Sequence, residues 1–263
     1  DQQVILHFGG VTSAYYVWVN GEKVGYAQGS RLPSEFDITE YVKAGKNKIA
    51  VQAFRWSDGS YLEDQDHWRL SGIHREVYIT TQPKVSINDF FVQTKLNDTY
   101  DQGRIEIKPR LSNTNKTELA GWKIHGELFD AVNQPVANSK MIADAKRVAR
   151  IAFPQRDNFL FGDLAADIKQ PKLWTAETPY LYTLVLTLTD KSGKVVETRS
   201  TRVGFREVEF SPEGELLING KSVEIIGVNR HDHDHKKGKA LSREDLEEDV
   251  KLMKQFNINS VRT

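Results

Sequence analysis

Short apolar runs separated by turn residues make up the first 82 residues. Two of these runs flank Asn20-Gly21, and this dipeptide predicts a β-hairpin because both turn positions need a positive φ. A short helix is predicted over 38–44, ending at Gly45. Many short strands with frequent turns predict a jelly roll, and the first run has no turn before it, so we expect this domain to be truncated at its N-terminus. The predicted strands are residues 4–8, 15–19, 22–26, 49–54 and 77–79.

A second group of β-patterned segments follows the interruption at Pro83-Lys84. About seven short strands over roughly 120 residues are typical of an immunoglobulin-like β-sandwich. We assign this domain to 83–207 and the jelly roll to 1–82. The strands predicted in the second domain are residues 87–94, 104–112, 122–129, 148–153, 182–190 and 194–203.

The pattern changes to mixed α/β in residues 208–263. A second Asn-Gly pair, Asn219-Gly220, predicts another hairpin. Ser242 with Asp245 three residues later predicts a helix start, and 258–262 predicts the strand after that helix. Strand, helix and strand open a parallel α/β unit, here the first βαβ unit of a truncated (β/α)8 barrel. Because one such unit cannot cover both faces of its sheet, we expect the chain to be cut at both ends. The apolar positions at helical spacing are Leu246, Val250, Met253 and Phe256.

Composition narrows the class of protein. Thirty-six Lys and Arg balance 36 Asp and Glu, and 39% of the residues are hydrophobic. A nucleic-acid partner is disfavoured because such proteins normally carry a basic excess. No apolar run approaches the roughly 20 residues that span a bilayer, so no membrane partner is expected. The chain has no cysteine, which removes disulfides, thiolate metal sites and cysteine nucleophiles but leaves the compartment, cytoplasmic or periplasmic, undetermined.

The segment 55–69 combines four acids, two tryptophans and two arginines with Gly and Ser. Aromatic faces beside carboxylates suit sugar binding, since pyranose rings stack on aromatic rings and sugar hydroxyls donate hydrogen bonds to acids. The alternative interpretation is a solvated acidic loop in which Trp56 and Trp68 are core anchors.

Three histidines alternate just after an apolar strand, at His231, His233 and His235. If the strand continued, alternation would place them on one face, which suggests a metal site. Histidines at a strand end more often bind substrate or form hydrogen bonds. Active-site groups of barrel enzymes lie at the C-terminal ends of strands, so His231 is the preferred candidate.

Taken together, these motifs resemble glycoside hydrolase family 2, and within it the large bacterial β-galactosidases. The resemblance covers essentially the whole chain, and five anchors in the right order make it specific. They are residues 8–37 with their hairpin, 55–75 ending in Ser-Gly-Ile-His-Arg, 203–207 (Val-Gly-Phe-Arg-Glu), 227–231 (Gly-Val-Asn-Arg-His) and 259–263 (Asn-Ser-Val-Arg-Thr).

The resemblance implies a retaining β-galactosidase that removes terminal non-reducing β-D-galactose residues. Its acid/base and nucleophile glutamates lie outside this chain, so the fragment alone is expected to be inactive. By position, Asp66 matches the carboxylate that contacts the galactose 6-hydroxyl and a bound Na⁺. His231 matches the histidine that hydrogen-bonds the sugar, and Arg262 matches the arginine that orients the nucleophile. The family's Mg²⁺ ligands also lie outside the chain, and the full-length enzyme is expected to be a homo-oligomer.

The chain departs from the family pattern directly after His231. The family typically continues Glu-His-His-Pro, whereas this chain has Asp232-His233-Asp234-His235. Two other functions remain open. A sister enzyme, β-glucuronidase or β-mannosidase, shares the domain order but lacks a segment like 56–69. A non-catalytic carbohydrate-binding β-sandwich protein would explain the first two domains but not a barrel start with Asn-Arg-His at a strand end.

Overall fold

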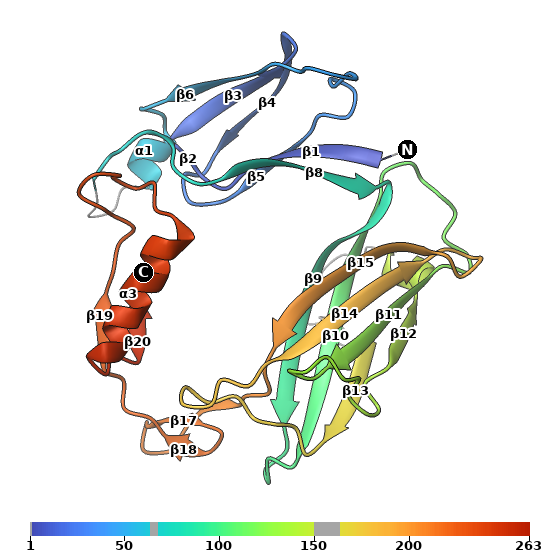
Figure 1. The fold of residues 1–263 in the computed structure, drawn as a ribbon, viewed down its shortest axis with the longest axis vertical. Coiled ribbons are helices and arrows are strands. Elements are labelled where there is room, and N and C mark those ends of the chain that lie inside the picture. The colour runs from blue at the N-terminus through green and yellow to red at the C-terminus, as the bar shows by residue number, and fades with distance from the viewer. Residues whose placement is uncertain (1, 64–67, 150–163) are drawn as a thin grey trace. The chain divides into compact units, whose positions relative to one another are not determined.

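The structure is a computed structural model that describes residues 2–63, 68–149 and 164–263. It is mainly β and divides into two compact units. The first unit combines residues 1–82 with 225–263, and the second contains residues 83–224 (Figure 1). No helix in the described part of the chain is long and apolar enough to cross a membrane.

The N-terminal part of the first unit is built from antiparallel strand pairs. Its three sheets have the orders β5-β1-β8, β4-β3-β6 and β2-β7. Apolar side chains that alternate along β1 and β3 are buried, Val17 and Val19 among them, and form one core. The strands are β1 (Gln2–Phe8), β2 (Val11–Thr12), β3 (Ala14–Val19), β4 (Glu22–Gln28), β5 (Ser34–Asp37), β6 (Ile49–Phe54), β7 (Gly72–Ile73) and β8 (Val77–Pro83).

The predicted hairpin is confirmed, but the predicted helix at 38–44 is wrong. Asn20 and Gly21 have φ values of 53° and 93° and join β3 to β4. Residues 38–44 instead form a turn that buries Ile38. Only the N–H groups of Tyr41 and Val42 bond back to the Ile38 carbonyl. This turn does not extend into a helix, because the Asn47 side chain bonds the backbone N–H and carbonyl of residue 43 instead.

The second unit is a sandwich of two antiparallel sheets, with strand orders β13-β10-β9 and β12-β11-β14-β15 (Figure 1). Inward side chains of both sheets, such as Ile105 and Leu186, are fully buried in one core. Its elements are β9 (Val85–Leu96), β10 (Gln102–Asn113), β11 (Lys123–Phe129), β12 (Met141–Asp144), α2 (Ala145–Val148), β13 (Leu164–Lys169), β14 (Tyr182–Thr189) and β15 (Val195–Val203).

The strand predicted at 148–153 is wrong where the structure describes it. Val148 ends the short helix α2, whose N-cap Asp144 accepts a hydrogen bond from the Arg147 N–H. The rest of that prediction, 150–153, lies outside the described residues. Strands β12 and β13 were not predicted. The five other strands predicted in this sandwich correspond to β9, β10, β11, β14 and β15.

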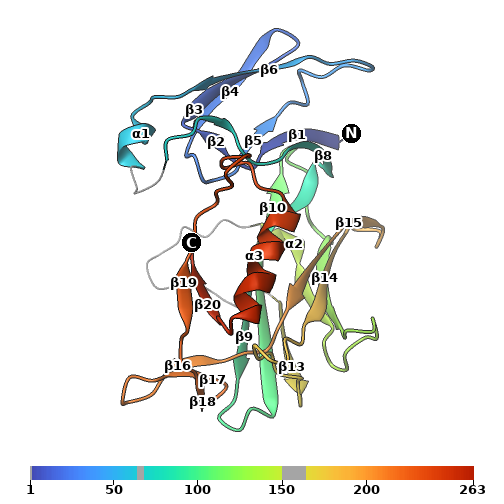
Figure 2. The same cartoon turned by 60° about the vertical axis from the view of Figure 1, so that its left-hand side comes forward.

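The C-terminal segment contains the second hairpin and the predicted strand–helix–strand unit. Asn219 and Gly220, with φ values of 49° and 71°, turn β17 (Leu216–Ile218) into β18 (Lys221–Ser222), and β16 (Val208–Phe210) pairs on the other side of β17. Strands β19 (Gly227–Asn229) and β20 (Ser260–Arg262) are parallel, with helix α3 (Arg243–Gln255) between them in sequence (Figure 2). None of the residues of α3 is buried.

Candidate active site

The structure places two of the three predicted site residues on one sheet edge. Arg262 is the last residue of β20 and is paired with Asn229, the last residue of β19. His231 follows two residues after β19, and the Arg230 N–H donates to the Arg262 carbonyl at 2.8 Å. Both residues therefore lie at the C-terminal ends of adjacent parallel strands. The third predicted residue, Asp66, lies outside the described residues.

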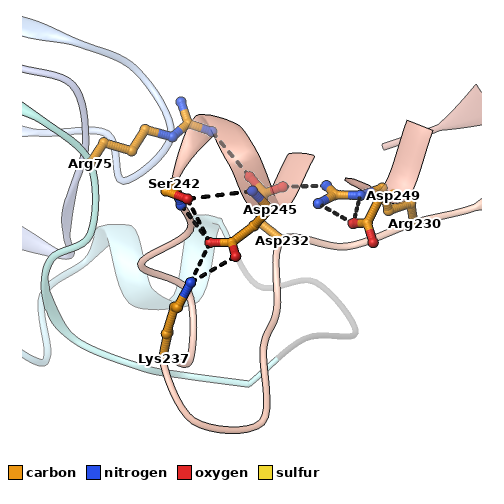
Figure 3. A network of polar contacts seen from close by, with 7 residues as sticks. All are labelled: Arg75, Arg230, Asp232, Lys237, Ser242, Asp245 and Asp249. Carbon is orange, nitrogen blue, oxygen red and sulfur yellow. Dashed lines mark hydrogen bonds and ion pairs between the residues drawn. The ribbon is translucent and has the colours of Figure 1, made fainter. Parts of the chain in front are cut away.

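Arg230 is the centre of a network of ion pairs beyond β19 (Figure 3). Its Nε and Nη2 atoms each lie 2.8 Å from Oδ2 of Asp249 on α3, and its Nη1 contacts Oδ1 of Asp232. The Arg230 side chain is only 13% exposed. Burial by itself lowers the pKa of Arg230, but hydrogen bonds to Asp232 and Asp249 outweigh it and raise that pKa. The guanidinium is thus held charged between two carboxylates.

Asp232 has a second partner in the N-terminal part of the same unit. Its Oδ2 lies 3.6 Å from Nη2 of Arg75, shortly after β7. Burial by itself raises the pKa of Asp232, but the Arg230 hydrogen bond and the charges of Arg230, Arg75 and Arg31 lower it below its ordinary value. The ionised carboxylate therefore bridges two arginines that come from distant parts of the sequence.

The three alternating histidines, His231, His233 and His235, do not lie on a strand. Strand β19 ends at Asn229, and the following residues turn around Asp234, whose Oδ1 accepts hydrogen bonds from two backbone N–H groups at 2.8 Å. The condition that would align His231, His233 and His235 on one face is therefore not met. Among the residues the structure describes, no group of three or more His, Asp or Glu side chains is arranged to hold a metal ion.

The aromatic loop after β6 is exposed rather than anchored in the core. Trp56 and Trp68 are 52% and 59% exposed, so the interpretation of both as core anchors is wrong. The guanidinium groups of Arg55 and Arg69 lie 5.5 and 5.4 Å from the Trp56 ring. Trp68 contacts the His233 ring, with centroids 4.0 Å apart and planes inclined at 43°. A four-residue helix, α1 (Gly59–Leu62), shapes this loop.

A small cavity of about 60 Å³ is lined by this loop, by residues 12–13 and 30–31, and by Lys239 from the segment after β19. Its charged lining residues are mostly cationic, and burial followed by the Arg31 charge lowers the pKa of Lys239. Glu63 is its acidic lining residue, and its carboxylate accepts from the Ser30 N–H at 3.2 Å. The described residues of this region therefore form a cationic surface beside the two exposed indole rings of Trp56 and Trp68. The charged lining residues are Arg31, Arg55, Glu63, Arg69 and Lys239.

Sequence reasoning missed the network around Arg230. Arg75 and Arg230 lie in the motifs 55–75 and 227–231, but neither was given a role of its own. Asp232 was noted only because the family pattern has Glu at that position. Asp249 gave no signal beyond its place on the polar side of a predicted helix. One usable signal existed, which is that a basic residue, Arg230, directly precedes His231 and an acidic residue, Asp232, directly follows it.

Three family models match consecutive parts of the chain. The sugar binding domain of glycosyl hydrolases family 2 matches residues 1–83, the family 2 domain matches 85–206, and the family 2 TIM barrel domain matches 208–263. The chain therefore belongs to glycoside hydrolase family 2. The predicted order of sugar-binding jelly roll, immunoglobulin-like sandwich and barrel start is confirmed.

Within the family, the chain is similar to curated β-galactosidases. The chain is 44% identical to a β-galactosidase of Priestia megaterium and 45% identical to one of Alteromonas mediterranea, over 100% of this chain in both cases. It spans about a quarter of the length of these relatives, 25% and 24% respectively.

Solved structures show the same fold. A β-glycosidase from Bacteroides vulgatus matches with a TM-score of 0.80 at 27% identity, covering 100% of this chain and 31% of that one. A β-glucuronidase from Ruminococcus gnavus matches with a TM-score of 0.79 over 100% of this chain and 43% of that one. Its identity of 21% supports the shared fold alone.

Proposed function

We propose that this chain is part of a retaining β-galactosidase that hydrolyses terminal non-reducing β-D-galactose residues. One observation carries the proposal: curated β-galactosidases are 40–45% identical to the chain over nearly its whole length. In a retaining mechanism two carboxyl groups ~5–5.5 Å apart act as nucleophile and acid/base. The catalytic pair is proposed to belong to the part of the barrel beyond the start matched here.

Within this proposal the chain supplies groups that bind and orient. His231 hydrogen-bonds the sugar hydroxyls from the end of β19, and Arg262, at the end of the adjacent β20, orients the nucleophile carboxylate. Their common sheet edge supports these roles, because barrel enzymes carry their active sites at the C-terminal ends of the strands. Asp66 is proposed to accept a hydrogen bond from the galactose 6-hydroxyl.

Na⁺ and Mg²⁺ remain part of the proposal on sequence resemblance alone. Asp66, the proposed Na⁺ ligand, is outside the described residues, and the Mg²⁺ ligands are proposed to lie beyond residue 263. Assembly into a homo-oligomer, with neither nucleic acid nor membrane as partner, is proposed on the same basis. The equal counts of basic and acidic residues, 36 each, support the exclusion of nucleic acid.

The test is substrate choice by the protein expressed from its complete gene. We expect hydrolysis of an aryl β-D-galactoside, with a kcat/KM at least about 100-fold above that for the matching β-glucuronide and β-mannoside, because a site built to bond substrate hydroxyls rejects sugars that leave its polar groups unpaired. NMR of the first product should show β-galactose, as retention requires. Preference for the glucuronide or mannoside would establish a sister enzyme. Binding of galactosides without turnover of any glycoside would establish a carbohydrate-binding protein.

A further inference from the structure

The residues on both sides of His231 are held by ion pairs. Arg230 precedes it and is fixed to Asp249 of α3 through two contacts of 2.8 Å. Asp232 follows it and contacts Arg230 through Oδ1 and Arg75 through Oδ2 (Figure 3). The backbone that carries His231 is therefore restrained at the residue before it and at the residue after it.

These contacts differ in strength. The pair of Arg75 with Asp232 spans 3.6 Å, and both side chains are more than a third exposed, so water and salt weaken it. Arg230 is nearly buried and hydrogen-bonded, and charge-assisted hydrogen bonds of this kind are the strong ones. Removing the Asp232 charge would leave a nearly buried guanidinium with one carboxylate instead of two, a costly arrangement. Asp232 is thus the member whose loss disturbs both neighbours.

The same segment touches the N-terminal part of the unit at two further points. The His233 ring packs on Trp68, with centroids 4.0 Å apart. A side chain at Gly238, where φ is +63°, would come within 3.0 Å of Leu70, so the backbone approaches closely there. Contacts at positions 232, 233 and 238 therefore dock the segment after β19 against residues 68–75.

We propose that Asp232 is a positioning residue that holds His231 in the orientation needed to bind the sugar, by bridging Arg230 and Arg75. The proposal rests on the proposed function in that it takes His231 to contact substrate. The carboxylate itself touches no substrate, and it acts through the backbone of its neighbour. Although Asp is shorter than the Glu expected from the family pattern, its two oxygens still reach one arginine each.

The test is a double-mutant cycle in the protein expressed from its complete gene, on whichever aryl β-glycoside the wild type hydrolyses. Asp232→Asn keeps the shape but removes the charge, so kcat/KM should fall roughly tenfold to a hundredfold, the range for losing one hydrogen bond to a charged group. In a His231→Ala background the same substitution should change kcat/KM by less than about threefold, because two residues that act through one contact are not additive. Asp232→Glu, which keeps the negative charge, should retain most of the wild-type activity.

The matched control is Asp167→Asn, which removes one of the two carboxylate partners of Arg104 in the other unit (2.9 Å), leaves Glu106 as the second, and should leave kcat/KM unchanged. Equal losses in both His231 backgrounds, or no loss beyond that of the control, would overturn the proposal. If Asp232→Asn fails to fold by circular dichroism, Arg75→Gln breaks the weaker side of the bridge, together with the hydrogen bond from Arg75 to the Arg31 carbonyl. Its loss of activity must then also disappear in the His231→Ala background, and persistence of that loss overturns the proposal. An inactive wild type would instead refute the proposed function.

Discussion

At the scale of single residues, burial decides which ion pairs matter. Arg243 and Glu247 form a pair at 2.8 Å on α3, but the arginine side chain is 86% exposed, so solvent screening leaves it little effect on stability. Arg230 makes contacts of the same length to Asp249 with a side chain that is 13% exposed. In the sequence only Arg243 and Glu247 look like a pair, because they have i,i+4 spacing, whereas Arg230 and Asp249 are 19 residues apart. Only their burial, which depends on the folded unit, separates a surface pair from a structural one.

Asp66 gives the first prediction at this scale. In the protein expressed from its complete gene, Asp66→Asn keeps the side-chain shape and removes the charge. A hydrogen bond to a charged group is worth ~1.5–3 kcal/mol, so kcat/KM for an aryl β-galactoside should fall by roughly one to two orders of magnitude. The activity should also respond less to added Na⁺. Steady-state kinetics across a Na⁺ series measures both effects.

An arabinoside analogue is the internal control for this variant. It lacks the C6 hydroxymethyl group and never makes the proposed contact, so it should lose much less activity than the galactoside. Equal losses on both substrates would point to a general loop defect. Wild-type activity together with wild-type Na⁺ dependence would show that Asp66 had been assigned the wrong role.

At the scale of secondary-structure elements, the start of α3 depends on an ionised Asp245. The Ser242 N–H donates to Oδ2 of Asp245 at 2.8 Å, and Lys237 Nζ lies 2.7 Å from Oδ1 (Figure 3). The Lys237 and Ser242 hydrogen bonds lower the pKa of Asp245 from 3.8 to about 2. Because the folded-state pKa is depressed, the stabilisation is complete above pH ~4 and is lost as the pH falls toward ~2.

This second prediction can be measured as the helicity of α3 against pH, by hydrogen exchange between pH 5 and pH 2 (roughly the window of the titration). In the protein expressed from its complete gene, the exchange rate of the first-turn amides, taken relative to the intrinsic rate at each pH, should rise through that window. In Asp245→Asn the rise should be absent, since the asparagine stays neutral throughout. Lys237→Met removes the largest cause of the pKa shift and should move the rise to higher pH. An unchanged profile in both variants would show that Asp245 does not control this helix end.

A third prediction concerns the apolar side of α3. Leu246, Val250 and Phe256 are 39%, 55% and 71% exposed, and packing of an apolar face supplies most helix stability. In the isolated 263-residue chain we therefore expect weak hydrogen-exchange protection over 242–263. Strands β10 and β14, whose inward side chains are fully buried, should be strongly protected and serve as the control. Strong protection across 242–263 would contradict this expectation.

The elements that the sequence predicted are those with local causes. Both Asn-Gly hairpins follow from backbone angles that few other residues adopt, and the capping of α3 by Ser242 follows from a four-residue motif. The errors at 38–44 and at Val148 have another origin. In both places short polar side chains, Asn47 and Asp144, bond the backbone and fix a turn or a helix start where the apolar pattern alone indicated something else.

At the scale of the whole molecule, the chemistry is proposed to lie outside this chain. The purified 263-residue chain should therefore show no turnover of an aryl β-galactoside above a control preparation from host cells that lack the enzyme. Adding the remaining part of the protein in trans, or expressing the complete gene, should restore activity. Turnover by the isolated chain, after host enzyme has been excluded, would show that it contains its own catalytic carboxylates.

The candidate site was predictable in part for the same reason as the elements. His231 and Arg262 could be placed at strand ends, because each belongs to a short motif next to an apolar run. The partners of the intervening residues could not be placed. Arg75 and Asp232 are far apart in sequence, as are Trp68 and His233, and no local sequence pattern predicts contacts between such distant residues. They arise from the packing of one unit out of two separate stretches.

That composite unit has a consequence for the order of events during translation. Within this chain, residues 1–82 leave the ribosome before residues 83–224, and the stretch 225–263 of the first unit emerges after both. Domains generally fold as units during synthesis. All strands of the sandwich have therefore been synthesised before the last strands of the first unit. On the nascent chain, the ion pair between Arg75 and Asp232 cannot form until the whole sandwich has been synthesised. The surroundings of His231 are thus among the last features of this chain to form.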